Sequence, residues 1–234
     1  MPSNHSTILL HRESGSSSRP GAGFFRGRLG IATPGQMPRE ITTPNGPLDA
    51  LLMESGPLRR AKFAILALDV VDYSLHIERD DWATVCRLRN LYHNVIAPAA
   101  AANRGRIVRI VGDGALVVFG DATSAVRCAF AIQSDVCRSE SILEPALQLR
   151  LRAGIDTGET IAMDGDIHGR SVIIAARLEA LANPGEIWLT RRTYIEAEND
   201  IKVLCDDLGE RRVRHIKRPV RVYRISRQSL PANH

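Results

Sequence analysis

Residues 106–120 have the sequence RIVRIVGDGALVVFG, two apolar runs joined by Gly112-Asp113-Gly114. Glycine adopts backbone conformations that other residues avoid, so this segment predicts a tight turn between two strands. Asp113 is then placed at the tip of a hairpin. An aspartate in such a turn is common without any function, and its carboxylate is also available to a cation.

Upstream of the hairpin, residues 62–69 have the sequence KFAILALD and end at Asp69. A short, continuous apolar run that ends at a charged residue is typical of a buried central strand. If the sheet places the end of this strand beside the hairpin, Asp69 and Asp113 converge, and two carboxylates suit a pair of magnesium ions. The alternative is that each is an ordinary strand-end or turn aspartate.

Hydrophobic periodicity predicts the other elements. Helical spacing runs from Trp82 to Ala99, after Asp80 and Asp81, which are suited to cap the helix. Further helices are expected over 121–138, 170–182 and 191–198, and further strands over 147–155, 186–190, 201–204 and 220–225. This order predicts an α+β fold with helices on one face of a largely antiparallel sheet.

Composition divides the chain into an arm and a domain. Residues 1–58 hold 7 of the 12 prolines and 8 of the 18 glycines and lack apolar periodicity. We therefore expect a disordered or weakly ordered arm there. Residues 61–226 are expected to form one domain, followed by a tail over 227–234, since 234 residues with 44% hydrophobic content can bury one sizeable core.

The cysteines and the apolar runs predict a cytoplasmic protein. The 4 cysteines form no CxxC pair, which indicates reduced thiols, and no apolar run is long enough to span a membrane. The net charge of +5 does not by itself separate nucleotides, nucleic acids and membranes as partners. Residues 209–227 are strongly basic but contain one aromatic residue, Tyr223, which favours a solvated basic face over nucleic-acid binding.

Three segments, LALDVVDYS, RIVRIVGDGALVVFG and DGDIHGRSVIIAARLEALANPGEI, resemble successive motifs of bacterial class III adenylyl and guanylyl cyclase catalytic domains. The closing segment DLGERRVRHIKRPVRVYRI is similar to the end of these domains. The resemblance implies the ferredoxin-like class III cyclase fold over residues 61–226. It also implies an adenylate cyclase that converts ATP to cyclic AMP and pyrophosphate, as a homodimer with active sites shared across a two-fold interface.

The resemblance assigns the family's metal-binding aspartates to Asp69 and Asp113, which would hold two Mg²⁺ or Mn²⁺ ions. In the family these ions favour the ribose alkoxide and bind the phosphates during attack on the α-phosphorus. The triphosphate would lie against the backbone amides of Val70, Val71, Asp72, Tyr73 and Ser74.

The resemblance also assigns residues to the base and the α-phosphate. Arg177 would stabilise the charge that develops on the α-phosphate. Asp166 would accept a hydrogen bond from the exocyclic amine of adenine, with Arg109 as its cationic partner. Guanine presents a carbonyl at that position, so the carboxylate favours ATP over GTP.

Four positions depart from the family's pattern. Ile173 stands where active members carry an asparagine that orients the ribose, and Asp72 replaces a glycine of the triphosphate loop. Arg109 replaces a lysine, and Arg170 lies at a helix start that usually has another residue. Ile173 and Asp72 together motivate a second hypothesis, a degenerate cyclase domain that binds a nucleotide or a partner with little or no turnover.

Overall fold

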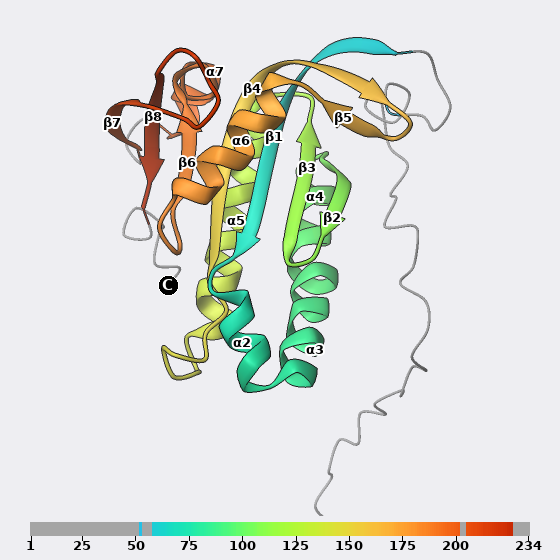
Figure 1. The fold of residues 1–234 in the computed structure, drawn as a ribbon, viewed down its shortest axis with the longest axis vertical. Helices are drawn as coiled ribbons and strands as arrows, with labels where there is room; N and C mark the ends of the chain where they lie inside the picture. Colours follow the sequence, from blue (N-terminus) through green and yellow to red (C-terminus); the bar gives the residue numbers. More distant parts are fainter. Residues whose placement is uncertain (1–51, 53–57, 202–204, 227–234) are drawn as a thin grey trace, which may run out of the picture. The chain divides into compact units, whose positions relative to one another are not determined.

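The structure is a computed structural model that describes residue 52 and residues 58–201 and 205–226. These residues form an α+β domain around one eight-stranded sheet (Figure 1), as the sequence predicts. Most of the predicted arm and the whole of the predicted tail lie outside the described residues. Leu52 is described, and it is buried in the same apolar cluster as Phe63. Packing against the sheet therefore begins within the predicted arm.

The helices and strands are labelled in Figure 1. Their bounds are β1 (Arg59–Val70), α2 (Tyr73–Arg79), α3 (Asp81–Leu91), the π-helical turn η1 (Tyr92–Ile96), α4 (Ala97–Ala102), β2 (Arg106–Val111), β3 (Gly114–Phe119), α5 (Ala122–Glu140), β4 (Leu151–Met163), β5 (Asp166–His168), α6 (Arg170–Leu181), β6 (Ile187–Thr190), α7 (Arg191–Ile201), β7 (Cys205–Arg211) and β8 (Val220–Ile225).

Strand β1 lies inside the sheet, whose strand order is β2-β3-β1-β4-β6-β8-β7, with β5 paired to β4. It is antiparallel to both neighbours: Leu68 pairs with Ala115 of β3, and Asp69 pairs with Arg152 of β4. Among the described strands, β4 and β6 form the one parallel pair, so the predicted largely antiparallel sheet is confirmed. This pairing brings the C-terminal end of β1 beside the turn that precedes β3.

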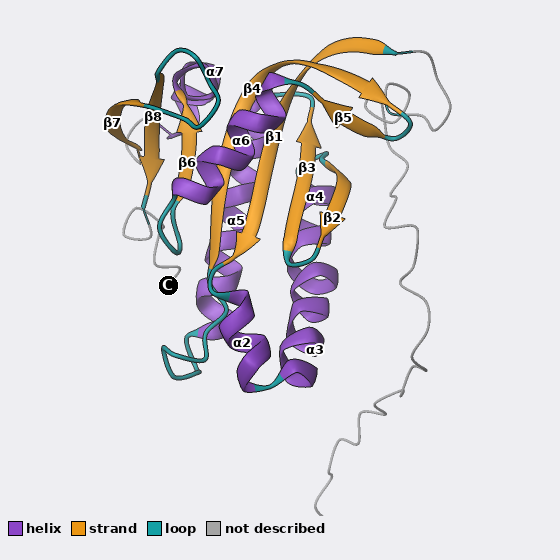
Figure 2. Ribbon diagram, viewed as in Figure 1, coloured by secondary structure: helices purple, strands orange, loops and turns teal. Residues whose placement is uncertain are grey.

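Helices cover both faces of the sheet, because alternate residues of β1 are apolar on each side. Leu66 and Leu68 belong to the larger cluster, which also contains residues of α3, α4, α5 and α7, the layer that the sequence predicts. Phe63 and Ile65 face the other side, where they share a cluster with Ala175 of α6. Figure 2 shows α6 lying across the sheet on that side. The prediction that all the helices lie on one face is therefore wrong for α6, the predicted helix 170–182, because a strand buried on both faces needs a cover on each.

The helix predicted from Trp82 to Ala99 forms as α3, η1 and α4, so it contains a π-helical turn. Asp80 caps its start by accepting a hydrogen bond from Ala83 N at 2.9 Å, and Asn103 is its C-cap. Between α3 and α4, the turn η1 begins at Tyr92. Trp82, which the periodicity placed on the apolar face, is 74% exposed. Figure 1 shows the reason: the first turns of α3 extend past the end of the strands.

Two short elements beside the candidate site were not predicted, α2 after β1 and β5 after β4. Segments of seven and three residues carry too little periodicity to be recognised. The predicted strand 147–155 begins only at Leu151. The predicted strand 201–204 is wrong at residue 201, which ends α7; residues 202–204 lie outside the described residues, and β7 begins at Cys205. The hairpin and the other predicted elements form close to their expected bounds.

Gly154 on β4 sets how closely α6 approaches the sheet. An added Cβ would lie 2.1 Å from the Ala175 carbonyl oxygen and 2.3 Å from Glu179 N. Both are backbone atoms of α6, so Gly154→Ala should lower the free energy of unfolding by roughly 1–3 kcal/mol. Urea denaturation followed by circular dichroism measures this. Gly120→Ala is the matched control, because a Cβ there meets nothing within 4 Å; equal midpoints for the two variants would contradict the prediction.

Candidate active site

Asp69 and Asp113, which lie far apart in the sequence, meet at one edge of the sheet. Asp69 is the next-to-last residue of β1, and Asp113 lies in the turn between β2 and β3, which Gly112 permits with a φ of 61°. The Asp69 and Asp113 side chains lie within hydrogen-bonding reach of one another, and the Asp113 carboxyl group accepts a hydrogen bond from Val70 N. We call these two aspartates the acid pair.

The acid pair is electrostatically unfavourable in the absence of a cation. Burial, followed by the charge of Asp69, raises the pKa of Asp113, although backbone donors oppose the shift. One cation of the chain offsets part of this charge: Arg152 donates to Asp69 Oδ2 from Nε at 3.0 Å and from Nη2 at 2.6 Å. The contact follows from the sheet, because Asp69 and Arg152 are paired in register on β1 and β4.

A third carboxylate lies behind this arginine. Arg152 Nε is 2.6 Å from Glu179 Oε1 on α6, but its hydrogen bond is directed to Asp69. Glu179 Oε1 is buried and accepts no hydrogen bond from the described residues. Burial, and then the charge of Asp69, raises the pKa of Glu179 to about 7 despite the nearby guanidinium. The region around the acid pair therefore holds more negative than positive charge.

Two tyrosines border the acid pair. Tyr73 is half-buried at the start of α2, and burial together with the charge of Asp113 raises its pKa. Tyr92 is only 7% exposed, and its hydroxyl has no hydrogen-bond partner among the described residues. Burial raises the pKa of Tyr92, and the charges of Asp113 and Asp69 add to the effect. Both phenols thus lie within electrostatic reach of the acid pair.

Arg109 and Asp166, predicted to select the base, are brought together from β2 and β5. Arg109 donates to Asp166 Oδ2 from Nε at 3.1 Å and also from Nη2. The other oxygen, Asp166 Oδ1, accepts a hydrogen bond from Ile167 N at 2.7 Å. Both carboxylate oxygens are therefore engaged within this chain. Oδ2 accepts two hydrogen bonds and Oδ1 accepts one, so Oδ1 retains a lone pair for a further donor.

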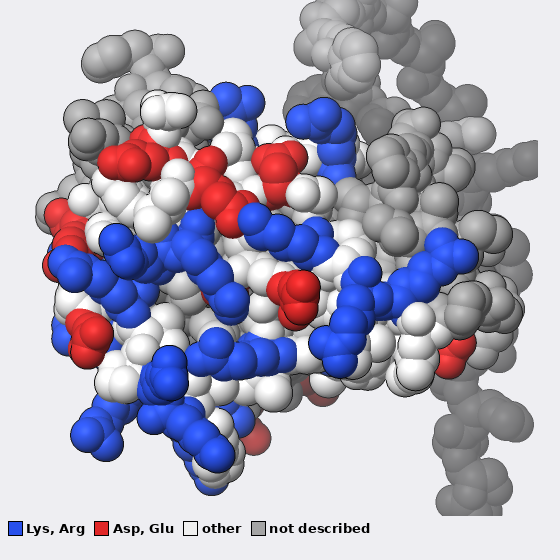
Figure 3. Space-filling model, turned by 90° about the horizontal axis from the view of Figure 1, so that it is seen from above, with Lys and Arg blue, Asp and Glu red and all other residues white. Residues whose placement is uncertain are grey.

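Ile173 and Arg177 lie on α6, one turn apart. Ile173 is 49% exposed and lines a groove of about 640 Å³ with Gly169, Arg170 and the 215–218 segment, His215, Ile216, Lys217 and Arg218. Three of these side chains are cationic, which suits an anion. Figure 3 shows that Lys and Arg side chains also cover much of one face of the molecule, with acidic side chains in smaller groups.

Only some of the backbone amides of residues 70–74, which are predicted to bind the triphosphate, are free to do so. Val70 N donates to Asp113, and Val71 N donates to the Arg150 carbonyl oxygen at 2.8 Å. The amides that remain available to the triphosphate are therefore those of Asp72, Tyr73 and Ser74, at the start of α2. Asp72 has a left-handed backbone with φ of 55° and is exposed. That conformation suits the glycine of the family, and aspartate is one of the few other residues that tolerates it.

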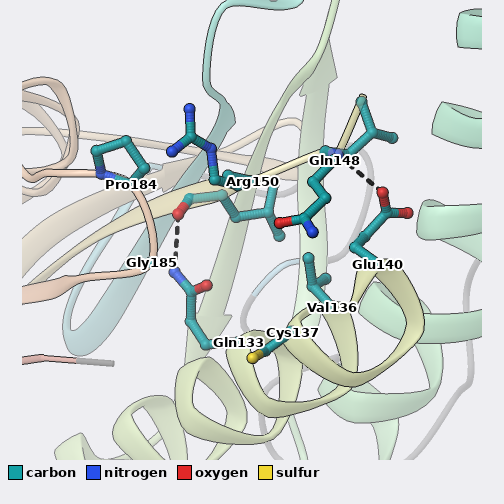
Figure 4. Close-up of a pocket in the computed structure, with 10 residues that line it drawn as sticks. Gln133, Val136, Cys137, Glu140, Gln148, Arg150, Pro184 and Gly185 are labelled. Atoms are coloured by element: carbon teal, nitrogen blue, oxygen red, sulfur yellow. Dashed lines mark hydrogen bonds between the residues drawn. The ribbon is translucent and has the colours of Figure 1, made fainter. Parts of the chain in front are cut away.

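A separate small cavity of about 30 Å³ lies between α5 and β4 (Figure 4). It is lined in part by Gln133, Cys137 and Glu140, and Gln133 donates to the Leu151 carbonyl oxygen at 3.1 Å. That volume suits a water molecule and not a nucleotide. None of the predicted site residues lines it.

The donor set of the acid pair fits a hard divalent cation. Within the described part of the chain, no group of three or more His, Cys, Asp or Glu side chains is arranged to hold a metal ion alone. Mg²⁺ commonly takes only one or two carboxylates from a protein and keeps water and substrate phosphates as its other ligands. Two carboxylates forced together, with a buried hydroxyl lacking a partner nearby, provide such an incomplete site.

Comparison with known proteins identifies the family. A profile of the adenylate and guanylate cyclase catalytic domain matches residues 58–227. This chain belongs to the adenylate and guanylate cyclase family. The cyclase domain is 36% identical over 173 residues to the putative adenylate cyclase 3 of Rhizobium meliloti (strain 1021), which is 73% of this chain and 29% of that protein. It is 27% identical over 146 residues to an adenylate cyclase of Glutamicibacter nicotianae, 34% of that protein. The chain thus spans about a third of these relatives or less.

Solved structures place the cyclase domain among the same proteins. An adenylate/guanylate cyclase/hydrolase from Silicibacter pomeroyi has a TM-score of 0.69 and 35% identity, covering 73% of this chain and 99% of that one. The adenylyl cyclase CyaB from P. aeruginosa has a TM-score of 0.65 and 29% identity, covering 75% and 100%. The predicted class III cyclase fold is therefore confirmed. Among the described helices, none combines the length and the apolar composition that a membrane span requires.

Sequence reasoning missed three residues around the acid pair: Arg152, Glu179 and Tyr92. The alternation of residues 147–155 marked Arg152 as an ordinary polar position of a half-buried strand, and nothing in the sequence showed that it faces Asp69. Glu179 lies two residues after Arg177 on α6, so its position in the AARLEAL segment, which resembles the family's motif, was the one available signal. Tyr92 was read only as an apolar helix position.

Glu179→Gln tests the electrostatics around the acid pair. Because the pKa of Glu179 is raised to about 7, the folded protein binds this proton more tightly than the unfolded chain does. The contribution of the protonated Glu179 carboxyl group to the free energy of unfolding is therefore complete below the pKa it has in the unfolded chain. It is lost as the pH rises through about 7. Glutamine does not titrate, so at pH 8 in EDTA the variant should exceed the wild type in free energy of unfolding by about 1–3 kcal/mol, with a smaller difference at pH 5.

Chemical denaturation at the two pH values measures both differences. The exposed Glu144→Gln is the control, and its stability should follow that of the wild type at each pH. A Glu179→Gln protein less stable than the wild type at pH 8 would show that the Arg152 contact outweighs the burial of the carboxylate.

Proposed function

We propose that this chain is the catalytic domain of an adenylate cyclase, which converts ATP to cyclic AMP and pyrophosphate with two divalent cations. The acid pair carries the proposal, since the fold presses Asp69 and Asp113 together at the sheet edge. Membership of the cyclase family and the adenylate cyclases among its relatives support the same reaction.

Asp69 and Asp113 would hold two Mg²⁺ or Mn²⁺ ions. When bound, these ions would supply Lewis-acid stabilisation of the phosphates and of the attacking ribose oxygen. The chain's own part is to fix the two carboxylates: Asp113 is held by Val70 N, and Asp69 is held by Arg152. The amides of residues 72–74 remain available to the triphosphate.

Arg109 and Asp166 would recognise the adenine. Asp166 would accept a hydrogen bond from the exocyclic amine with the remaining lone pair of Oδ1, while the bonds from Arg109 to Oδ2 orient the carboxylate. Arg177, half-buried on α6, would donate to the α-phosphate as negative charge develops there.

We propose a homodimer in which the acid pair of one subunit serves with Arg109, Asp166 and Arg177 of the other. Support comes from exposed apolar side chains on the elements that carry these three residues. They are Ile110 and Val111 on β2, Met163 at the end of β4 next to β5, and Ile173 on α6. Exposed apolar residues that recur on neighbouring elements favour burial against a partner.

The second candidate function is a cyclase domain with little or no turnover. Ile173 favours it, because its exposed apolar side chain can neither donate nor accept a hydrogen bond at the position the family uses to orient the ribose. Asp72 adds a carboxylate at the triphosphate loop, where like charge weakens phosphate binding.

Asp113→Asn tests the proposed reaction. Formation of cyclic AMP from ATP is measured with Mg²⁺ and with Mn²⁺, and the loss of one carboxylate should lower the rate by at least about 100-fold. Asp135→Asn is the matched control, because Asp135 pairs with Arg138 on the surface of α5. Equal rates for wild type and Asp113→Asn would reject catalysis at the acid pair.

The double variant Ile173→Asn with Asp72→Gly separates the two candidate functions. If these positions limit turnover, restoring them should raise the rate of cyclic AMP formation by roughly 10²–10³. The two single variants show how much of the increase in rate comes from each position. Calorimetric titration with a non-cyclisable ATP analogue reports any gain in nucleotide affinity. Wild-type turnover that the double variant does not increase would remove the reason for considering the domain degenerate.

A further inference from the structure

Tyr92 lies where the α-helix α3 changes to the π-helical turn η1. The turn η1 begins at Tyr92, and Ala97 N donates to the Tyr92 carbonyl oxygen, five residues back instead of four. A π-helical turn inserts one residue into a helix, is less stable than a regular turn, and is found mostly at functional sites. Tyr92 is the first residue of this turn.

The ring of Tyr92 is packed, but its hydroxyl is not satisfied. The side chain is 7% exposed and belongs to the large apolar cluster with Leu91, Ile96 and Val70. Its hydroxyl is buried and has no hydrogen-bond partner among the described residues. A buried hydroxyl without a partner destabilises a protein, and phenylalanine would fill the same space without this penalty. Packing alone therefore accounts for the ring and not for the hydroxyl.

The hydroxyl lies within electrostatic reach of the acid pair. Tyr92 shares its apolar cluster with Val70, the residue after Asp69, and the charges of Asp113 and Asp69 add to burial in raising the pKa of Tyr92. It donates to neither carboxylate in this structure. Tyr73, the other phenol near Asp113, is half-exposed and can bond to water. Tyr92 is therefore the enclosed donor whose acceptor is missing.

We propose that Tyr92 is a further ligand-binding residue of this site, which donates a hydrogen bond to an oxygen atom that enters the site with a divalent cation or a triphosphate. This inference rests on the proposed function, since it assumes that the acid pair binds such a ligand. The incoming oxygen would supply an acceptor, so ligand binding would satisfy a buried hydroxyl that has no partner among the described residues. Tyr92 thereby couples ligand binding to the packing of the helix.

Tyr92→Phe tests the proposal by separating stability from binding. Mn²⁺ affinity is measured by electron paramagnetic resonance, alone and with α,β-methylene ATP, and Tm is measured in EDTA. We expect an equal or higher Tm for the variant, because an unsatisfied hydroxyl has been removed. We expect affinity to fall by about tenfold in the loaded site, the effect of one lost hydrogen bond to a charged or strongly polar oxygen.

The two titrations, with Mn²⁺ alone and with Mn²⁺ plus the analogue, identify the source of the oxygen. A loss with Mn²⁺ alone indicates an oxygen that accompanies the cation, and a loss seen only with the analogue indicates a phosphate oxygen. Tyr194→Phe is the control, because Tyr194 stacks on Tyr223 with ring centroids 4.0 Å apart and lies on α7. Its binding should equal that of the wild type.

Two results overturn the proposal while leaving the proposed function intact. One is unchanged affinity of Tyr92→Phe for Mn²⁺ and for the analogue. The other is a Tm that falls in EDTA together with the affinity, which would assign Tyr92 a purely structural role. A wild-type protein that binds neither Mn²⁺ nor the analogue, and forms no cyclic AMP, would overturn both proposals together.

Discussion

The close approach of two carboxylates is the interaction on which the rest of this structure depends. Strand β1 lies between β3 and β4, so antiparallel pairing with β3 places the end of β1 beside the hairpin turn, and Asp69 beside Asp113. Like charges in a partly buried place repel one another, which raises the pKa of Asp113. The apolar clusters on both faces of the sheet hold the strands, and hence the carboxylates, in this arrangement.

The surroundings of the acid pair remain incompletely compensated. Arg152 neutralises one charge, yet Glu179 adds another and keeps a buried oxygen without a hydrogen bond. Tyr92 adds a buried donor without an acceptor. These groups come from β4, α6 and η1, three separate elements, so the imbalance is a property of the assembled domain. A ligand that brings positive charge and acceptor oxygens would compensate the negative charge and pair the free donor. This compensation would add to the free energy of binding.

Family membership and catalytic rate depend on different parts of the molecule. Membership follows from the sheet, the helices and their order, which match solved cyclase domains. On the proposed function, the rate would depend instead on single side chains of α6 and of the segment after β1, where Ile173 and Asp72 stand. An exposed isoleucine and an exposed aspartate leave the fold intact. Such positions can therefore change activity without changing stability.

The sequence by itself determined the main elements, the turn at Asp113 and the end of the strand at Asp69, because these depend on local periodicity and turn chemistry. It also carried the motifs by which the family can be recognised. Only the tertiary structure decided that Arg152 faces Asp69, that Glu179 lies behind it, and that the Tyr92 hydroxyl has no partner. These contacts join residues of different elements, and their register, burial and direction are set by packing, which no local pattern encodes.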